Sequence, residues 1–137
     1  MIAPDSSVTI AAAAPWHVAH QAATAALVAD QPALIAHVAF ETTAALSRMP
    51  ESQRLSPAVV LQWLERRFPT TWLTLPAAAT RRGLRAAVDS GIRGGALYDA
   101  LIAATAAHHK CTLVSADRRA APVYAAIGVD VVYLASE

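Results

Sequence analysis

The chain has 137 residues, of which 55% are hydrophobic and 15% charged, with a formal net charge of +1. This length suits one domain with a sizeable core, and we expect a single domain over residues 1–137. So balanced a charge does not by itself indicate nucleic-acid binding. Every apolar run is interrupted before the roughly 18 residues that a membrane span needs.

Two features of the sequence indicate where the protein acts and which sites its cysteine can form. The N-terminal residues lack the basic region that opens a signal peptide, so we expect a cytoplasmic protein that does not act at a membrane. A single cysteine, Cys111, excludes an internal disulfide and a cysteine-based zinc site. We interpret Cys111 as a small apolar residue at the start of a strand, in preference to a reactive thiol.

The first half of the chain is predicted to be one short strand followed by helices. Residues 1–4 form the candidate strand, which Pro4 cuts, and Asp5 to Ser7 supply caps for the short helix that follows. Residues 15–29 and 30–49 are predicted as long helices with a proline near each start. Residues 55–68 form another helix, with Ser56 as its cap and one apolar face.

The second half changes character near residue 111. Residues 69–75 are extended or turn-like, residues 76–91 form a helix that stops at Gly91, and residues 96–109 form an apolar helix. Strands are predicted at 111–116 and 129–134, with a turn and a short helix between them. Strand, helix and strand over so short a distance predict a parallel α/β arrangement, whose small sheet is covered by alanine-rich helices.

Four carboxylates occupy unusual places in this pattern. Asp5 and Asp117 come just past the carboxyl ends of the first two predicted strands, which is where parallel sheets bind ligands. Glu41 shares an apolar helical stripe with Val38, and Asp99 lies in the first turn of an apolar helix. A carboxylate among apolar residues must lose water or find a partner.

Each of these acids also has an ordinary explanation. Asp5 can cap the helix that begins at Ser6, and Asp117 can cap the turn that follows it. Asp99 complements the positive end of its own helix, and Glu41 can pair with Arg48 or reach solvent. Together the four are harder to explain, because clustered acids raise one another's pKa. Oxygen-only ligands would then favour a hard divalent cation, Mg²⁺ or Mn²⁺.

Four segments carry a resemblance to a known family. "IAPDSSV", "AFETTAALSRM", "LYDALIAATA" and "LVSADRRAAPVYAAIGVDVV" resemble the PIN domain, and more narrowly the toxin of a VapBC type II toxin–antitoxin pair. The resemblance spans nearly the whole chain, although residues 50–92 match only in being helical. It implies an α/β/α sandwich with a small, mainly parallel twisted sheet, a metal-dependent endoribonuclease, and a VapB-like antitoxin as partner.

The resemblance also implies roles for individual residues. Ser115, two residues before the last acid, would orient the site, and Ser6 would support it. One departure is Pro4, which directly precedes the first acid and suggests a sheet edge or a bulge. The family's acidic motifs fall on Asp5, Glu41, Asp99 and Asp117. The first, third and fourth of these would hold one or two Mg²⁺ or Mn²⁺ ions, with Glu41 ligating directly or through water.

Other residues are candidates for partner contacts. Arginines in the second half would hold the RNA backbone, although solvated helix faces explain them as well: Arg93, Arg118 and Arg119, with Arg81, Arg82 and Arg85 beyond them. Tryptophans in excess of what an alanine-rich core needs would line an antitoxin groove or a homodimer face, with core packing as the alternative: Trp16, Trp63 and Trp72. The histidines are expected at surfaces and helix ends, away from any carboxylate at the matching helical step.

Two other functional classes are weighed against this hypothesis. A phosphatase of haloacid-dehalogenase type also begins with an acid after a first strand, but it needs a second acid where Ser7 stands. It also needs a lysine before the last acidic motif, whereas Lys110 lies at the start of the strand. A PIN-like module that binds RNA or a partner without cleavage is the other alternative.

Overall fold

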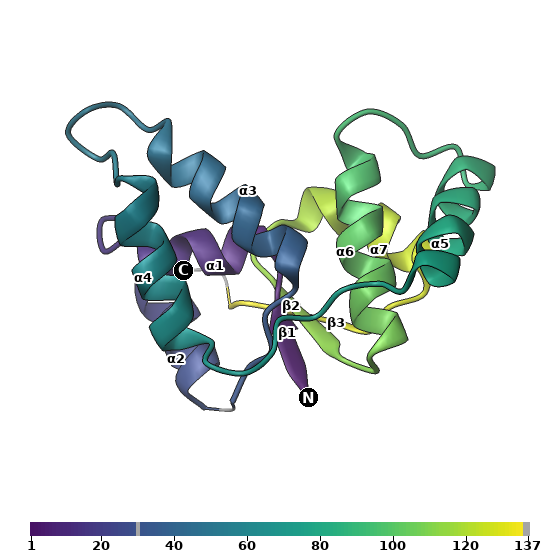
Figure 1. Ribbon diagram of the computed structural model, residues 1–137, viewed down its shortest axis with the longest axis horizontal. Coiled ribbons are helices and arrows are strands. Elements are labelled where there is room, and N and C mark those ends of the chain that lie inside the picture. The colour runs from purple at the N-terminus through teal and green to yellow at the C-terminus, as the bar shows by residue number, and fades with distance from the viewer. Residues whose placement is uncertain (30, 136–137) are drawn as a thin grey trace.

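A parallel sheet lies at the centre of the molecule, with helices on both of its sides (Figure 1). The computed structural model describes residues 1–29 and 31–135. In this part of the chain the elements, in order, are β1 (Ile2–Pro4), α1 (Ser6–Ala13), α2 (His20–Val28), α3 (Ala36–Ser47), α4 (Pro57–Arg67), α5 (Ala77–Asp89), α6 (Ala96–His108), β2 (Thr112–Ser115), a 3₁₀ turn η1 (Arg118–Ala120), α7 (Ala121–Ile127) and β3 (Val131–Tyr133).

The strands of the described residues form one parallel sheet in the order β1-β2-β3. Pro4, on the edge strand β1, pairs with Val114 of β2. The N–H of Asp5 donates to Val114 O over 2.9 Å. Because N–H groups alternate in direction along a strand, the N–H that Pro4 lacks would face away from β2. Pro4 therefore fits the open side of an edge strand. A sheet edge was one of the two possibilities, with a bulge, that the sequence suggested for Pro4.

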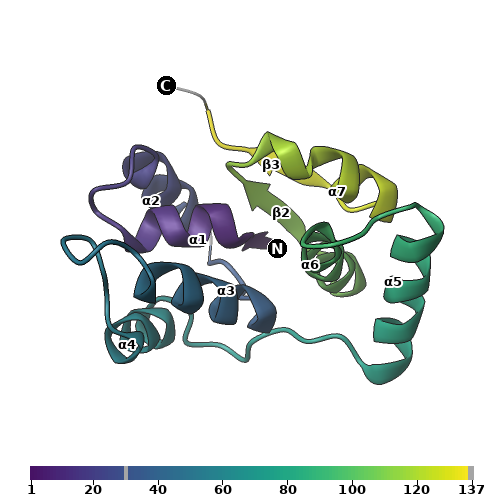
Figure 2. The same cartoon turned by 90° about the horizontal axis from the view of Figure 1, so that it is seen from above.

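The helices form the outer layers of an α/β/α sandwich. Helices α1 to α4 gather on one side, and α5, α6 and α7 on the other (Figures 1 and 2). Both α1 and α6 contact the central strand β2. The fold therefore confirms the predicted α/β class with a small parallel sheet.

The core fills the space between these layers. Leu113 of β2 is fully buried, as are Val8 of α1 and Ala103 of α6, while Ile102 and Phe68 are 1% exposed. Burying one large apolar side chain contributes about 1.5–3 kcal/mol. Small alanines along α1 and α6 let both helices approach the sheet closely.

Two predicted helices begin later than the sequence pattern suggested. The helix predicted from residue 15 begins at His20, after a turn in which the His17 ring accepts the N–H of Ala19 over 3.0 Å. The helix predicted from residue 30 begins at Ala36. The buried residues before it run along the open side of β1, where Ala33 N–H donates to Ile2 O over 2.9 Å. Asp30, its predicted start, lies outside the described residues.

The remaining predicted elements are found close to their expected limits. Ser56 caps α4, with its hydroxyl accepting the N–H of Val59 over 3.3 Å. The extended segment 69–75 meets the residues before α3 through a bridge between Leu73 and Ile35. Gly128 ends α7 with a φ of 89°, a left-handed conformation that glycine adopts without strain, and β3 follows.

Candidate active site

A pocket of about 200 Å³, called here the carboxylate pocket, lies where the carboxyl ends of β1 and β2 meet α3 and α6. All four acids singled out in the sequence line it. The chain brings them there from four separate segments, because parallel strands end at the same edge of a sheet. The complete lining is Asp5, Ser6, Ser7, Ile10, Glu41, Ala45, Arg48, Asp99, Asp117 and Tyr124.

Asp5 is the most tightly held of these acids. It is 2% exposed, and its Oδ1 accepts hydrogen bonds from Ser7 Oγ at 2.5 Å and from Val8 N–H at 3.3 Å. Tyr124 donates its hydroxyl to Oδ2 over 2.7 Å. Asp5 therefore caps α1 as well as lining the pocket, so the ordinary explanation and the functional one are compatible.

Tyr124 connects α7 to this carboxylate. It is 2% exposed. Burial, followed by the negative charge of Asp5 and its hydrogen bond, raises the pKa of the phenol. The hydroxyl consequently stays protonated at ordinary pH, and it remains a donor to Asp5.

Hydrogen bonds also tie the ends of β1 and β2 together. Ser7 Oγ accepts the N–H of Ala116 over 2.8 Å while it donates to Asp5. The fully buried Ser115 accepts the N–H of Asp117 over 3.1 Å. Ser115 thus sets the backbone of Asp117 and does not itself line the pocket.

Asp117 lies at the more open side of the pocket. Its Oδ1 accepts the N–H of Arg119 at 3.0 Å and the Nε of Arg119 at 3.1 Å. The Asp117 side chain is 34% exposed and that of Arg119 is 93% exposed. So exposed an ion pair contributes little to stability, and it leaves the second carboxylate oxygen free of these contacts.

Glu41 faces the pocket from α3. Ser6 Oγ donates to Glu41 Oε1, which fits the supporting position expected for Ser6. His37, one turn earlier on α3, places Nε2 3.5 Å from Oε2. These contacts replace the pairing with Arg48 that the sequence offered as an alternative.

Asp99 is the most perturbed acid in the pocket. Burial raises its pKa to about 6, and the charges of Glu41, Asp5 and Asp117 add to the shift in that order. In the described part of the chain, its carboxylate has no hydrogen-bond donor. Repulsion from three neighbouring acids is the electrostatic condition that a bound cation relieves.

The donor chemistry of the pocket suits a hard divalent cation. Its four carboxylates offer oxygen ligands only, as Mg²⁺ and Mn²⁺ prefer. Within residues 1–29 and 31–135, however, no group of three or more His, Cys, Asp or Glu side chains is already spaced to hold a metal ion. The residues fit such an ion by type and charge, and the expected ligand set stays a prediction.

Comparison with known proteins decides the family. The family model of the PIN domain matches residues 2–126. The chain belongs to the PIN-domain family. Ribonuclease VapC40 of Mycobacterium tuberculosis is 38% identical over 131 residues, covering 96% of this chain and 97% of that protein. Ribonuclease VapC27 of the same organism is 38% identical over 134 residues, covering 98% and 97%.

A solved structure supports the same fold for this PIN domain. The crystal structure of FitAcB from Neisseria gonorrhoeae contains a chain that matches with a TM-score of 0.67 at 21% identity, covering 96% of both chains. The resemblance seen in the four sequence segments is thus confirmed, and the haloacid-dehalogenase alternative is set aside. No helix among the described residues of this PIN domain has the length and apolar character to cross a bilayer.

Some pocket residues of this PIN domain were missed in the sequence. Ser7, Tyr124 and Arg48 line the pocket without having been assigned to it. Ser7 directly follows the predicted Ser6, so the "DSS" run was the available signal. Tyr124 lies 119 residues from Asp5, and nothing local in the sequence indicates their contact.

The expectation for the histidines was wrong in one case. His37 does lie at the matching helical step from a carboxylate, since Glu41 follows it by four residues and the two side chains approach to 3.5 Å. His20 and His109 lie at helix ends, as expected. His20 begins α2, with its Nδ1 2.9 Å from Ala11 O, and His109 follows α6, with its Nε2 2.8 Å from Thr74 O.

The remaining candidates from the sequence are the tryptophans, Cys111 and the arginines. Trp63 and Trp72 pack against the core, while Trp16 is 41% exposed. Cys111 is buried, and burial raises the pKa of its thiol, as expected of a structural cysteine. Arg118 lies over the Tyr133 ring at 4.5 Å and is exposed, as are Arg93, Arg81, Arg82 and Arg85.

Proposed function

We propose that this PIN domain is a metal-dependent endoribonuclease and the toxin of a type II toxin–antitoxin pair. The observation that carries the proposal is the convergence of Asp5, Glu41, Asp99 and Asp117 on one pocket. The names of its relatives support it, since VapC40 and VapC27 are both called ribonucleases. The substrate class that follows is RNA.

In the proposed site, Asp5, Asp99 and Asp117 hold one or two Mg²⁺ or Mn²⁺ ions, and Glu41 ligates directly or through water. The bound ion would supply a water of lowered pKa and positive charge beside the phosphoryl oxygens. Hydrolysis of the phosphodiester would leave a 3′-hydroxyl and a 5′-phosphate, the products that the family resemblance implies. The raised pKa of Asp99 supports this assignment, because burial, and then the charges of Glu41, Asp5 and Asp117, disfavour the negative form that a bound cation would stabilise.

The chain's own residues set the geometry of this chemistry. Ser7 and Tyr124 fix both oxygens of Asp5, and Ser115 fixes the backbone at Asp117. Ser6, at the start of α1, restrains Glu41 through its hydroxyl hydrogen bond. Residues that orient ligands in this way typically change metal affinity or activity by about 10–100-fold when they are removed.

The proposed partners follow from charge and from the family. The exposed arginines Arg93, Arg118 and Arg119 would contact RNA phosphates, which gives affinity without sequence readout. A VapB-like antitoxin and a homodimer complete the proposed assembly. We place this assembly in the cytoplasm, with residues 1–137 acting as one domain.

The decisive experiment is cleavage of a mixed-sequence RNA by the purified protein, with Mg²⁺ or Mn²⁺, against EDTA. The Asp99→Asn variant is expected to lose cleavage. Asp89→Asn serves as the matched control, because Asp89 is an exposed acid at the end of α5. RNA binding without metal-dependent cleavage would contradict the proposal and favour a PIN-like binding module.

A further inference from the structure

Two aromatic rings stack at the rim of the carboxylate pocket, and the proposed chemistry uses neither. The ring centroids of His37 on α3 and Tyr98 on α6 lie 5.2 Å apart, with their planes 11° from parallel. His37 approaches Glu41 to 3.5 Å, and Tyr98 directly precedes Asp99. The stacked pair therefore lies next to two of the carboxylates without lining the pocket itself.

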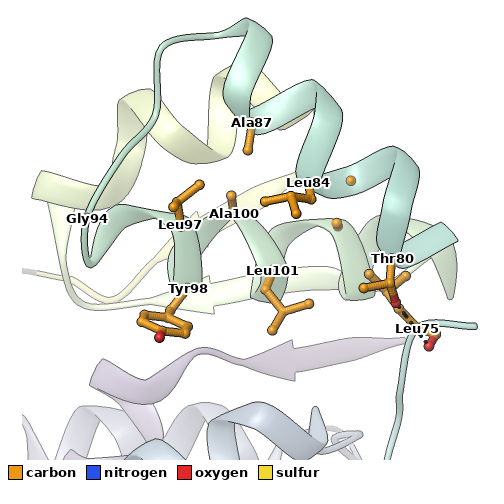
Figure 3. A pocket seen from close by; sticks show the side chains of 11 residues that line it. Leu75, Thr80, Leu84, Ala87, Gly94, Leu97, Tyr98, Ala100 and Leu101 are labelled. Carbon is orange, nitrogen blue, oxygen red and sulfur yellow. Dashed lines mark hydrogen bonds between the residues drawn. The ribbon is translucent and has the colours of Figure 1, made fainter. Parts of the chain in front are cut away.

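Tyr98 presents an open aromatic face. The residue is 55% exposed, although His37 covers one side of its ring. The exposed area therefore includes parts of the ring that His37 does not cover. Figure 3 shows Tyr98 projecting from α6 on the side away from Ala87 of α5. Within the described part of the chain, the Tyr98 hydroxyl has no hydrogen-bond partner.

The surroundings of this ring select the kind of group that can cover it. The carboxylates of Glu41 and Asp99 repel a phosphate at this position. A nucleobase is flat and uncharged, and its face stacks on aromatic side chains. RNA held with a phosphate in the carboxylate pocket would bring such a base to the rim.

We infer that the exposed face of Tyr98, backed by His37, stacks on a nucleobase adjacent to the phosphate that is cleaved. This inference rests on the proposed ribonuclease function and adds a substrate contact to it. Because every base offers a flat π-face, the contact sets the position of the strand and not its sequence. His37 acts as a positioning residue, since its ring supports Tyr98 from behind.

Binding is measured first, by fluorescence anisotropy with short single-stranded RNA and Mg²⁺. All proteins carry Asp99→Asn so that the RNA stays intact. Adding Tyr98→Ala is expected to raise Kd about tenfold, whereas Tyr98→Phe keeps it within about twofold. Phe40→Ala is the matched control, because Phe40 is an aromatic residue of α3, 77% exposed and outside the carboxylate pocket.

A second measurement separates base stacking from a purely structural tie between α3 and α6. The same RNA is prepared with a single abasic nucleotide at each position in turn. With Tyr98 present, one abasic position is expected to raise Kd about tenfold above the others. With Tyr98→Ala, that same position is expected to lose its extra effect, because the stacking partner is already gone.

The inference is overturned if Tyr98→Ala leaves Kd unchanged, or if it weakens every abasic RNA by the same factor. An equal effect of Phe40→Ala would also overturn it. Failure of the proposed function looks different. In that case the protein with Asp99 intact does not cleave RNA, while the position-specific abasic pattern still reports whether Tyr98 stacks on a base.

Discussion

The two sides of the carboxylate pocket are built differently. At the strand ends, Asp5 and Asp117 belong to a hydrogen-bonded frame in which Ser7 joins Asp5 to the N–H of Ala116. On the helices, Glu41 and Asp99 have fewer restraints. Glu41 meets Ser6, whereas the Asp99 carboxylate accepts no hydrogen bond from residues 1–29 or 31–135.

The two sides of the pocket are therefore positioned by different interactions. The strand side takes its positions from the register between β1 and β2, in which Pro4 faces Val114. On the helix side, burial and then the charges of the neighbouring carboxylates raise the pKa of Asp99. A frame made of hydrogen bonds is ready before a ligand arrives, while the helix side gains most from a cation.

The largest expected effect tests whether both sides serve one reaction. Asp5→Asn and Asp99→Asn should each lower kcat/KM for RNA cleavage by about a hundredfold or more, because each removes a proposed metal ligand. Single-turnover assays with saturating Mg²⁺ measure this. Full activity in either variant would remove that side of the pocket from the mechanism.

Tyr124 tests the strand side alone. Tyr124→Phe removes a donor from Asp5 without creating a large cavity. The free energy of unfolding should fall by about 1–3 kcal/mol because a buried carboxylate oxygen loses its partner, and activity should fall about tenfold. Tyr133→Phe, on β3, is the control. Urea denaturation and cleavage assays measure the two effects, and an unchanged activity would assign Tyr124 to stability only.

The pH dependence of stability tests the role of Asp99 on the helix side of the pocket. Its pKa is about 6 in the folded protein against 3.8 for an ordinary aspartate. Between about pH 4 and 6 the folded state therefore binds more protons than the unfolded state, and this contribution to stability declines as pH rises. Asp99→Asn should leave stability unchanged near pH 4 and raise it by about 1 kcal/mol at pH 7 in EDTA, after allowance for solvent screening.

A metal titration sharpens the same comparison. Mg²⁺ should raise the melting temperature of the wild type at pH 7, and much less at pH 4.5, because protonated Asp99 competes with the ion. Differential scanning fluorimetry with and without EDTA measures the shift. Equal stabilisation of the wild type and Asp99→Asn would place the ion away from the helix side.

The smallest expected effect concerns the arginines beside the pocket. Arg118→Ala should lower the slope of log Kd against log salt by about 0.7, the value for one phosphate contact on single-stranded nucleic acid. Arg66→Ala is the control, because Arg66 lies in the last turn of α4, away from the pocket lining. An unchanged slope for Arg118→Ala would leave its place over Tyr133 as its only role.

Much of the fold followed from local patterns. The strand near residue 112, the Gly128 stop and the strand near residue 131 all matched, because turn chemistry and β-branched runs act over a few residues. The predicted starts of α2 and α3 were wrong. In the first case the His17 ring competes for a backbone N–H, and in the second Ala33 and Ile35 are engaged by β1 and by Leu73.

The sequence by itself determined the identity of the four acids and their order, because each stands out against an apolar element or at a strand end. Only the tertiary structure decided their surroundings: that Tyr124 holds Asp5, that His37 stacks on Tyr98, and that Asp99 lacks a donor within the described residues. The reason is physical. Strand and helix patterns come from neighbours along the chain. These contacts instead join side chains that meet only when the helices on both sides pack around the sheet.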